Sequence, residues 1–586
     1  MGGRHGFARF GVLKRITHSR QLGFIVALAL VIALGAARIP ALAQDPPPDP
    51  PPFSLPFADP PGVNTWLYQQ HFGNTTAAFN YGSAWYAAGQ GLHFGLDLEA
   101  PCGTPILAIA DGVVTNVDAG SFGAGPHNLI LAHPGTGYTS LYGHLFARSS
   151  LAPGQNVARG EQIGLSGDPD GTCESRPHLH LEIRSEDYSV SYNPLPFFEV
   201  NWHMIASFGP FNHHFQQDIE HPYRWMKLED QPEVRFGGNL LNKYAQPWPV
   251  KLERRAPVSP PAARHLDPLP EQVAVRLEPV ALEAWNIGFW WRPGDSAAVY
   301  LIDAVPGQPS GVFRQPLDGS PRSLVELAPP SLFSPDGAVR VRDAGGGAME
   351  ITRLSDRASW NVYTGGNFPA VSPDGTRLLW EVLYDEITPG QNAPGLEIWV
   401  SNVDGSLRRC VHVQSGGWSV WLDAHRLLIV KPIPYMADTQ LYVLDIDDPA
   451  VTPTFLGSYR FLNGLKVSPG GGHIAFYLTF QENPADSGVY VQATQPGSAP
   501  RKLDFTGPYH WRDDRSLYTL SFDASQDAHA LGYIDIEENR HRWLTDPAVL
   551  PLRIANGEWS VSPDGTQIAF VTPADYGLYR LTVGPG

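Results

Sequence analysis

The chain has 586 residues and a formal net charge of −17, from 41 basic and 58 acidic side chains. Removal of residues 1–43, which carry six basic and no acidic residues, would leave a formal charge of −23. Such an acidic chain lacks the basic footprint of a nucleic-acid-binding protein, so we expect no nucleic acid partner. The charge also argues against electrostatic attraction to an anionic cell wall.

Residues 1–43 have the features of a secretory signal peptide. Basic residues precede an apolar run over about residues 22–37, and a small-x-small site, Ala41-Leu42-Ala43, ends the segment. The run is shorter than the roughly 20 residues of a membrane helix, so we expect no membrane span in the mature chain. We therefore expect a protein that is secreted or held in the cell envelope. Retention through an uncleaved anchor is the alternative.

The residues with metal-binding chemistry fall in three short segments. They are His93 and Asp97 in LHFGLD, His144 in LYGHL, and His178 and His180 in RPHLHLEIR. A hydrolytic zinc site needs about three imidazole or carboxylate ligands and an open position for water. It also needs a group that takes a proton near neutral pH, which histidine does. Five such residues therefore predict a zinc-dependent hydrolase.

Spacing indicates how these side chains could converge. The run HLHLEIR alternates polar and apolar residues and predicts a β-strand, so His178 and His180 share one face. Gly95, between His93 and Asp97, leaves room for a close approach of the backbone. His144 follows a β-rich run in which Pro134, Gly135 and Gly137 predict a hairpin turn.

At these positions the chain resembles the M23 family of zinc metallopeptidases, the lysostaphin and LytM group that cleaves peptidoglycan peptides. The matching segments are HFGLD, APCGTPILAIADGVV, LYGHL and HLHLEI, within about residues 64–200. The resemblance implies an antiparallel β domain that binds one zinc ion per chain through His93, Asp97 and His180. It makes His178 the general base. His144 would orient water or, when protonated, stabilise the oxyanion.

The three cysteines fit an oxidising compartment. Cys102 lies five residues after Asp97, and Cys173 lies five residues before His178. Both flank segments that must converge, so we expect a Cys102–Cys173 disulfide; two independent thiols are the alternative. Cys410 is the odd cysteine, and we expect it to be buried. Cys102 and Cys173 could instead be additional metal ligands, but the family pattern has no cysteine position among its ligands.

Several neighbouring residues bear on detail. The family has small residues before its HxH pair, whereas this chain has Cys173 and Arg176, which leaves the substrate preference open. His127 and His133 lie between the motifs, and we expect them to be structural or to support the ligands. His213 and His214 follow the domain, and we expect this pair to lie in a loop.

The C-terminal half repeats a turn motif. It starts at residues 291, 333, 371, 421, 467, 511 and 561, for example as VSPDGTRLLW and VSPDGTQIAFV. Intervals of 38 to 50 residues are typical of four-stranded propeller blades, and the phrase resembles the PD40 or TolB-type WD40-like repeat. We expect six or seven blades. Aspartates in these turns are expected to shape the backbone rather than to bind metal.

The sequence thus predicts an all-β, two-domain protein. Its expected parts are a signal peptide (1–43), a proline-rich linker (44–60), the peptidase domain (61–200), an extension and linker (201–274) and the propeller (275–586).

The expected activity is hydrolysis of peptide bonds in peptidoglycan stems or cross-bridges. A wall component or a protein is the expected partner of the propeller. Two alternatives remain open: a non-catalytic LytM-like scaffold that activates amidases, and an exported peptidase that acts on proteins.

Overall fold

The computed structural model describes residues 51–586 except 76, 79–81, 83–84, 209–215, 222, 242–263, 265, 284, 384–394, 434–435, 449, 451 and 586. The expected signal peptide and the pair His213 and His214 lie outside the described residues. Among the described residues, none of the helices combines the length and the apolar character needed to cross a bilayer.

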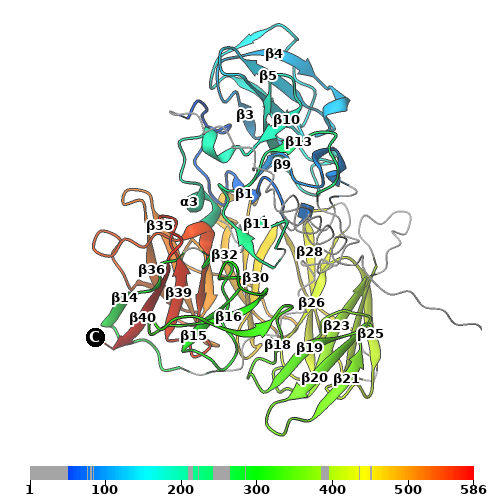
Figure 1. The fold of residues 1–586 in the computed structure, drawn as a ribbon, viewed down its shortest axis with the longest axis vertical. Coiled ribbons are helices and arrows are strands. Elements are labelled where there is room, and N and C mark those ends of the chain that lie inside the picture. Colours follow the sequence, from blue (N-terminus) through cyan, green and yellow to red (C-terminus); the bar gives the residue numbers. More distant parts are fainter. Residues whose placement is uncertain are drawn as a thin grey trace, which may run out of the picture. The chain divides into compact units, whose positions relative to one another are not determined.

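The N-terminal domain is built on one antiparallel sheet of nine strands (Figure 1). Seven strands run in the order β1-β2-β9-β6-β5-β4-β7, and β10 pairs with both β9 and β13. Their bounds are β1 Leu67–Gln70, β2 Leu96–Glu99, β4 Gly112–Val117, β5 Leu129–His133, β6 Tyr138–Gly143, β7 Asn156–Val157, β9 His178–Ser185, β10 Val190–Tyr192 and β13 Val234–Arg235.

Smaller elements complete this domain. A separate pair of strands is formed by β3 (Pro105–Leu107) and β8 (Gln162–Leu165). The short helices are η1 Ala87–Gly89, η2 Gly120–Phe122, η3 Leu195–Phe197 and α3 Trp202–Ser207.

Strand β9 lies in the middle of the sheet and shows why this sequence folds as it does. Leu179, Leu181 and Ile183 belong to the main hydrophobic core of the domain. The polar residues between them point to the opposite face, as period-two alternation requires. These polar side chains are buried as well, so this strand presents a polar but enclosed surface. The hairpin expected around residues 134–137 is present between β5 and β6.

The proline-rich segment differs from the expected linker in its described part. Phe53 and Phe57 are buried in the core of the N-terminal domain, and Phe53 pairs with Phe198 in an isolated bridge. Ser54 also donates its backbone N–H to the carbonyl of Ile109. The expectation of a free spacer through residue 60 is therefore wrong, because burial of two large aromatic rings outweighs the preference of proline for solvated, extended chain.

The segment after residue 200 also packs on the N-terminal domain. Trp202, on α3, contacts the ring of Tyr68 at 5.5 Å between centroids, and Leu228 joins the same core. Strands β11 (Gln216–Gln217) and β12 (Trp225–Met226) pair with each other, and β13 extends the main sheet through β10.

The C-terminal part is a β-propeller with seven blades among the described residues. Blades one to three comprise β15 Ala298–Ile302, β16 Gly311–Pro316 and β17 Ser323–Leu327; β18 Leu332–Phe333, β19 Val339–Gly345, β20 Ala348–Arg353 and β21 Ser359–Tyr363; and β22 Ala370–Val371, β23 Arg377–Leu383, β24 Gly395–Asn402 and β25 Arg409–Ser415.

Blades four to six comprise β26 Trp418–Trp421, β27 Arg426–Pro432, β28 Asp438–Asp445 and β29 Thr454–Arg460; β30 Leu462–Val467, β31 His473–Leu478, β32 Gly488–Ala493 and β33 Arg501–Lys502; and β34 Tyr509–Trp511, β35 Ser516–Asp523, β36 Ala528–Asp535 and β37 Arg540–Trp543. Short helices η4 (Pro484–Asp486) and η5 (Ala555–Gly557) lie between strands.

The last blade joins the two ends of the propeller. Its sheet has the order β14-β40-β39-β38, so the first strand, β14 (Val273–Ala281), pairs with the last, β40 (Leu578–Pro585) (Figure 1). Strands β38 (Trp559–Val561) and β39 (Gln567–Val571) complete it. This pairing of the first strand with the last closes the ring of blades.

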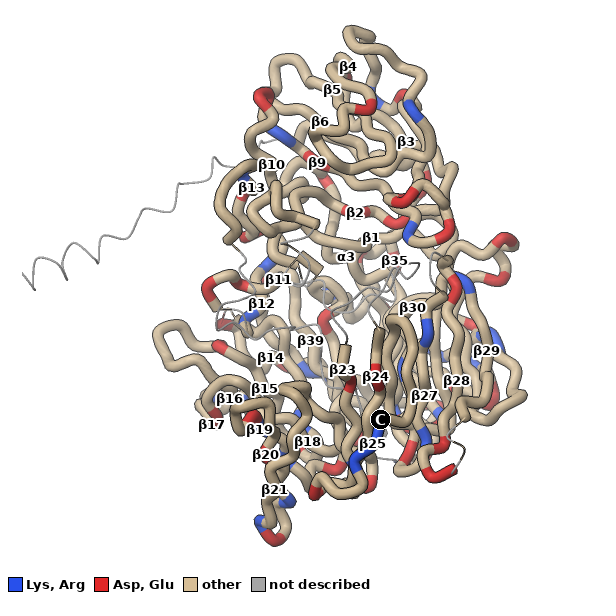
Figure 2. The backbone as a smooth tube through the Cα atoms, turned by 90° about the vertical axis from the view of Figure 1, so that its right-hand side faces the viewer, with Lys and Arg blue, Asp and Glu red and all other residues tan. Residues whose placement is uncertain are grey.

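The repeated SPDG segments form the turns between strands. In all three SPDG segments the serine hydroxyl donates to the aspartate: Ser334 to Asp336 at 2.5 Å, Ser372 to Asp374 at 2.6 Å and Ser562 to Asp564 at 2.5 Å. The same aspartates accept backbone N–H groups of the turn. These carboxylates therefore shape the backbone. In Figure 2 the charged residues of the blades lie mostly at strand ends and turns, whereas the strands are predominantly uncharged.

Candidate metal centre

The register of three neighbouring strands brings the sequence motifs together. Asp97 on β2 lies directly opposite His180 on β9. On the other side of β9, His180 lies opposite Gly143, the last residue of β6, so His144 follows beside it. His178 shares the face of His180. Residues that are up to 87 positions apart in the chain thus meet at one point of the sheet.

Three side chains form a compact set of metal donors. The ligand atoms of His93, Asp97 and His180 all lie within 4.8 Å of one another, and all three residues are buried. His93 Nε2 is 3.3 Å from both His180 Nδ1 and Asp97 Oδ1. Metal bonds of roughly 2.0–2.1 Å in tetrahedral geometry place neighbouring donors about 3.4 Å apart. The third separation, from His180 Nδ1 to Asp97 Oδ1, is 2.7 Å, which is a hydrogen bond that a bound metal ion would replace. The donor types, and two of the three separations, therefore fit a tetrahedral divalent metal ion.

Outer hydrogen bonds fix which ring nitrogens face this centre. His93 Nδ1 donates to the carbonyl of His71, which leaves Nε2 for a metal. His180 Nε2 donates to Glu182 Oε1 at 3.2 Å, which leaves Nδ1. Glu182 in turn accepts from Arg184 Nε at 2.6 Å. Carboxylates and carbonyls in this position orient metal-binding imidazoles and increase their basicity.

The motifs did not identify the residues that hydrogen-bond the metal-binding imidazoles, although the strand pattern contained a signal for two residues of this network. Glu182 and Arg184 continue the alternation of HLHLEIR, so strand periodicity places them on the same face as His178 and His180. The carbonyl of His71 gives no such signal, because a backbone acceptor in a loop can be any residue.

The electrostatics of the set favour a cation. Burial alone would raise the pKa of Asp97, but His93, His178 and the hydrogen bond from His180 hold that pKa well below its usual range. Burial would lower the pKa of His180, but Asp97 and Glu182 raise it to about 9. A metal ion would replace the proton on His180, so metal binding would be coupled to proton release.

Two further histidines lie beside the three donors and are held in the same way. His178 Nδ1 donates to the carbonyl of Arg176 at 2.7 Å, and His144 Nδ1 donates to the carbonyl of Gly125. Since a carbonyl can only accept, each ring keeps its proton on Nδ1 and presents Nε2 as an acceptor when neutral. The rings of His144 and His178 are 4.7 Å apart between centroids, and His178 Nε2 is 3.8 Å from Asp97 Oδ1.

The surroundings of His144 bear on the two roles expected for it. Burial, together with the neighbouring His178 and His180, lowers the pKa of His144 to about 3. A neutral ring with its proton on Nδ1 can accept a hydrogen bond from water at Nε2, whereas a protonated ring could donate from Nε2 to an oxyanion. Both roles stay predictions.

Close packing around the centre depends on two glycines. A Cβ atom on Gly95 would overlap the ring of His180, and one on Gly143 would overlap Ala124. His144 itself has a φ of 55°, a left-handed conformation that non-glycine residues seldom adopt. Its backbone N–H donates to the carbonyl of Ala124 at 3.0 Å, which holds it there. Such conformations persist where the surrounding structure imposes them, often at functional sites.

Cys102 and Cys173 form a disulfide, so neither provides a metal ligand or a free thiol. The bond ties the loop before β9 to the segment after β2. Cys410, in β25, is free and only half-buried, so the expectation that it is buried is wrong. Its thiol lies 3.4 Å from the carbonyl of His412, at a partly exposed position of the strand.

The other histidines of the domain lie outside the donor set. His133 is buried, and both its nitrogens are engaged at 2.8 Å, by the carbonyl of Asp111 and the hydroxyl of Ser140. His127 pairs with Asp118 at 3.0 Å. Both therefore have structural partners.

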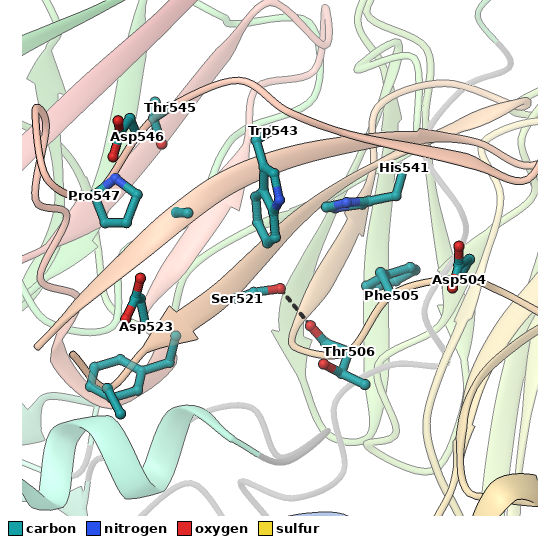
Figure 3. Close-up of a pocket in the computed structure, with 13 residues that line it drawn as sticks. Asp504, Phe505, Thr506, Ser521, Asp523, His541, Trp543, Thr545, Asp546 and Pro547 are labelled. Carbon is teal, nitrogen blue, oxygen red and sulfur yellow. Dashed lines mark hydrogen bonds between the residues drawn. The ribbon is translucent and has the colours of Figure 1, made fainter. Parts of the chain in front are cut away.

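A cavity of about 750 Å³ lies apart from the metal centre, in the sixth propeller blade (Figure 3). Trp543 and His541 of β37 project into it, and the hydroxyl of Ser521 donates to the carbonyl of Thr506 at its floor. Its other lining residues include Asp504, Phe505, Asp523 and Asp546. None of the proposed metal-binding or catalytic residues lines it.

Comparison with known proteins identifies the N-terminal domain. The sequence profile described as Peptidase family M23 matches residues 91–194. An uncharacterized metalloprotease of Haemophilus influenzae is 40% identical over 103 residues, which are 18% of this chain and 20% of that protein.

Two relatives have names that state an activity. The DD-carboxypeptidase/endopeptidase Mpg of Neisseria meningitidis serogroup B is 43% identical over 101 residues, or 17% of this chain and 22% of that protein. The peptidoglycan DD-endopeptidase ShyA of Vibrio cholerae serotype O1 is 35% identical over 91 residues, or 16% and 20%.

The chain thus spans about a fifth of the length of these relatives. The family profile nevertheless covers the segment that contains all five residues selected from the sequence, which confirms the resemblance drawn there. The protein therefore contains a peptidase family M23 domain, built on the sheet that gathers His93, Asp97 and His180.

Proposed function

We propose that the protein is an exported, zinc-dependent endopeptidase that hydrolyses peptide bonds in peptidoglycan stems or cross-bridges. The observation that carries the proposal is the set of buried donor atoms of His93, Asp97 and His180, within 4.8 Å of one another, with the rings of His144 and His178 beside them. Two imidazoles and one carboxylate, with room for water, are the donors of a catalytic zinc site.

When bound, zinc would lower the pKa of a coordinated water to about 7 and polarise the substrate carbonyl. The chain's own residues would supply the proton transfers. His178 Nε2, fixed by the hydrogen bond from Nδ1 to Arg176, would accept the proton of the attacking water and pass it to the leaving amine. Burial lowers the pKa of His178, so the ring is neutral and able to accept this proton near pH 7.

His144 would orient the attacking water. Its Nε2 is the free acceptor of a ring whose Nδ1 is bound to the carbonyl of Gly125. The short separation of the His144 and His178 rings would allow both to contact the same water. If the water donates a hydrogen bond to Nε2 of each ring, a lone pair on its oxygen would be held towards the carbonyl carbon of the substrate.

The proposed substrate and the proposed compartment are supported by different observations. Relatives whose names refer to peptidoglycan or to DD-carboxypeptidase and endopeptidase activity favour a cell-wall peptide substrate. Basic residues, an apolar run and a small-x-small site in residues 1–43 favour export. The expected partner of the propeller, a wall component or a protein, would bring the catalytic domain to its substrate.

Two variants of neighbouring histidines would test the roles. His180→Ala removes a proposed ligand, so we expect it to lose both zinc and activity. His178→Ala removes the proposed base, so we expect it to keep one zinc per chain and lose turnover by at least roughly 100-fold. Zinc content by elemental analysis and mass spectrometry of peptidoglycan digestion products would measure both effects.

His127→Ala is the matched control, because this histidine pairs with Asp118 outside the donor set. Loss of zinc in His178→Ala would show that the roles of His178 and His180 are exchanged. Release of peptides from a denatured protein but not from peptidoglycan would refute the proposed substrate. Full retention of activity in His180→Ala would refute the metal-dependent mechanism.

A further inference from the structure

Arg176 occupies an exposed position at the edge of the metal centre. It lies two residues before His178 and accepts that residue's Nδ1 proton through its own backbone carbonyl. Its guanidinium carbon is 5.5 Å from the centre of the Trp85 ring, which is 54% exposed. Next to Trp85, the ring of Tyr86 contacts His93 at 5.4 Å between centroids. Arg176 and Trp85 thus contact each other, and each lies within two residues of a side chain of the centre or of one that packs against it.

The backbone that carries Arg176 is held rigidly. Asp168, which is 1% exposed, accepts the N–H groups of Ser175 at 3.0 Å and of Arg176 at 2.9 Å. Its carboxylate also accepts the hydroxyl of Ser175. Cys173, three residues before Arg176, is fixed to Cys102 by the disulfide. The guanidinium therefore projects from a preorganised loop.

The charge of Arg176 has no carboxylate partner among the described residues. Arg184, on the same side of the domain, is by contrast tied to Glu182 at 2.6 Å. Asp168, the buried carboxylate nearest in sequence, is engaged by backbone N–H groups and a hydroxyl.

We propose that Arg176 determines substrate specificity by binding a free carboxylate group of the substrate close to the scissile bond. This inference rests on the proposed peptidase function. The planar guanidinium pairs with a carboxylate through two parallel hydrogen bonds, which lysine cannot reproduce. The cation–π contact with Trp85, at 5.5 Å from the guanidinium carbon to the ring centre, would hold the guanidinium in place and reduce its hydration.

The chemical class of substrate follows from this contact. A stem peptide that ends in a free carboxylate near the cleaved bond would be preferred over the same peptide with that group converted to an amide. A hydrogen-bonded pair of charges contributes enough to change kcat/KM by roughly 10-fold or more.

The test uses the full mature protein and a purified cross-linked stem-peptide dimer from digested peptidoglycan. A second sample of the dimer has its carboxyl groups converted to methylamides. We expect the wild type to cleave the carboxylate form with roughly 10-fold higher kcat/KM. In Arg176→Ala this preference should fall to within about 2-fold, whereas cleavage of the methylamide form should not change. Arg176→Lys should recover only part of the preference.

Arg235→Ala is the matched control, since it also removes an exposed positive charge, which here is paired with Glu233. Unchanged zinc content in Arg176→Ala would establish that the metal centre is intact. Equal loss of cleavage for both forms of the dimer would show a structural role and overturn the inference. An undiminished preference in Arg176→Ala would overturn it as well.

If the protein lacks the proposed peptidoglycan peptidase activity, the experiment gives a different result. In that case the wild type would release nothing from intact peptidoglycan and cleave neither form of the dimer. Both proposals would then fall together. Release from peptidoglycan by the wild type, without a preference between the two forms, would refute the role of Arg176 alone.

Discussion

At the scale of single residues, each imidazole of the centre has one nitrogen committed to a fixed partner. The partners are the carbonyls of His71, Gly125 and Arg176 and the carboxylate of Glu182. A carbonyl can only accept, so it selects both the tautomer and the orientation of its ring, whereas His180 is oriented between the carboxylates of Asp97 and Glu182. The chemistry of the site is therefore prepared by neighbours that bind no metal themselves.

Gly95 provides a residue-scale prediction. A Cβ atom at this position would overlap the ring of His180, so Gly95→Ala should displace a proposed ligand. We expect lost zinc and at least a roughly 100-fold fall in activity, since small displacements at a catalytic centre have effects of this size. Zinc content and peptide release would be measured together.

Gly120→Ala serves as the comparison, because a Cβ atom there meets nothing within 4 Å. It should retain both zinc and activity. If Gly95→Ala binds zinc as the wild type does, the close approach of Gly95 to His180 is not needed for the site.

At the scale of elements, β9 and its flanking loop organise the centre. The strand places His178 and His180 on the polar face, and the preceding loop ends in the carbonyl that holds His178. That loop has little regular structure, so its shape depends on Asp168 and on the disulfide. The sequence motif accounts for the strand, whereas the loop is determined by contacts with distant residues.

The disulfide leads to a prediction on stability. Cys102 and Cys173 are separated by 71 residues, and closing a loop of this length stabilises the folded chain by about 4 kcal/mol through the unfolded state. The double variant Cys102→Ser/Cys173→Ser should therefore unfold at lower denaturant concentration. Equilibrium unfolding of the N-terminal domain, followed by intrinsic fluorescence, would measure the change.

Cys410→Ser is the control, because that cysteine is free and lies in the propeller. It should leave unfolding of the N-terminal domain unchanged. An unaltered midpoint in the double variant would mean that the crosslink does not limit the unfolded chain.

At the scale of the whole molecule, one chain joins an M23 domain to a propeller that is closed by its own ends. Pairing of β14 with β40 unites residues about 300 positions apart, and contacts between neighbouring blades link the remaining sheets. One such contact is polar. Lys466 of β30 donates from Nζ to the carbonyl of Tyr509 on β34 of the next blade, at 2.8 Å.

This amine, on a half-buried side chain, predicts a pH dependence of propeller stability. Burial lowers the pKa of Lys466 to about 7 from the usual value of about 10.4 in an unfolded chain. Between these values the unfolded chain binds a proton that the folded chain does not. The free energy of unfolding should therefore rise with pH from 7 to 9, by at most about 1.4 kcal/mol per pH unit.

Lys466→Met removes the titrating group while retaining most of the side-chain volume. Denaturant unfolding of both proteins at several pH values would give the difference, which isolates Lys466 from other groups. Equal pH slopes for wild type and variant would contradict the assignment.

Much of this protein can be predicted from its sequence because the decisive patterns are local. The alternation in HLHLEIR predicts β9, and the recurring SPDG turns predict the propeller. The motifs also select the five residues that the fold brings together. By contrast, the buried Phe53 and Phe57 were misread as part of a spacer, because composition alone does not show which aromatic rings find a core.

Only the tertiary structure shows which ring nitrogens bind backbone carbonyls, that burial lowers the pKa of His144, and that the described residues form seven blades. The physical reason is that these properties depend on backbone carbonyls, burial and strand register between segments distant in the chain. Donor chemistry is a property of residue types and can be read along the sequence. The direction in which a donor points, and the charge it carries there, are set by neighbours that only folding supplies.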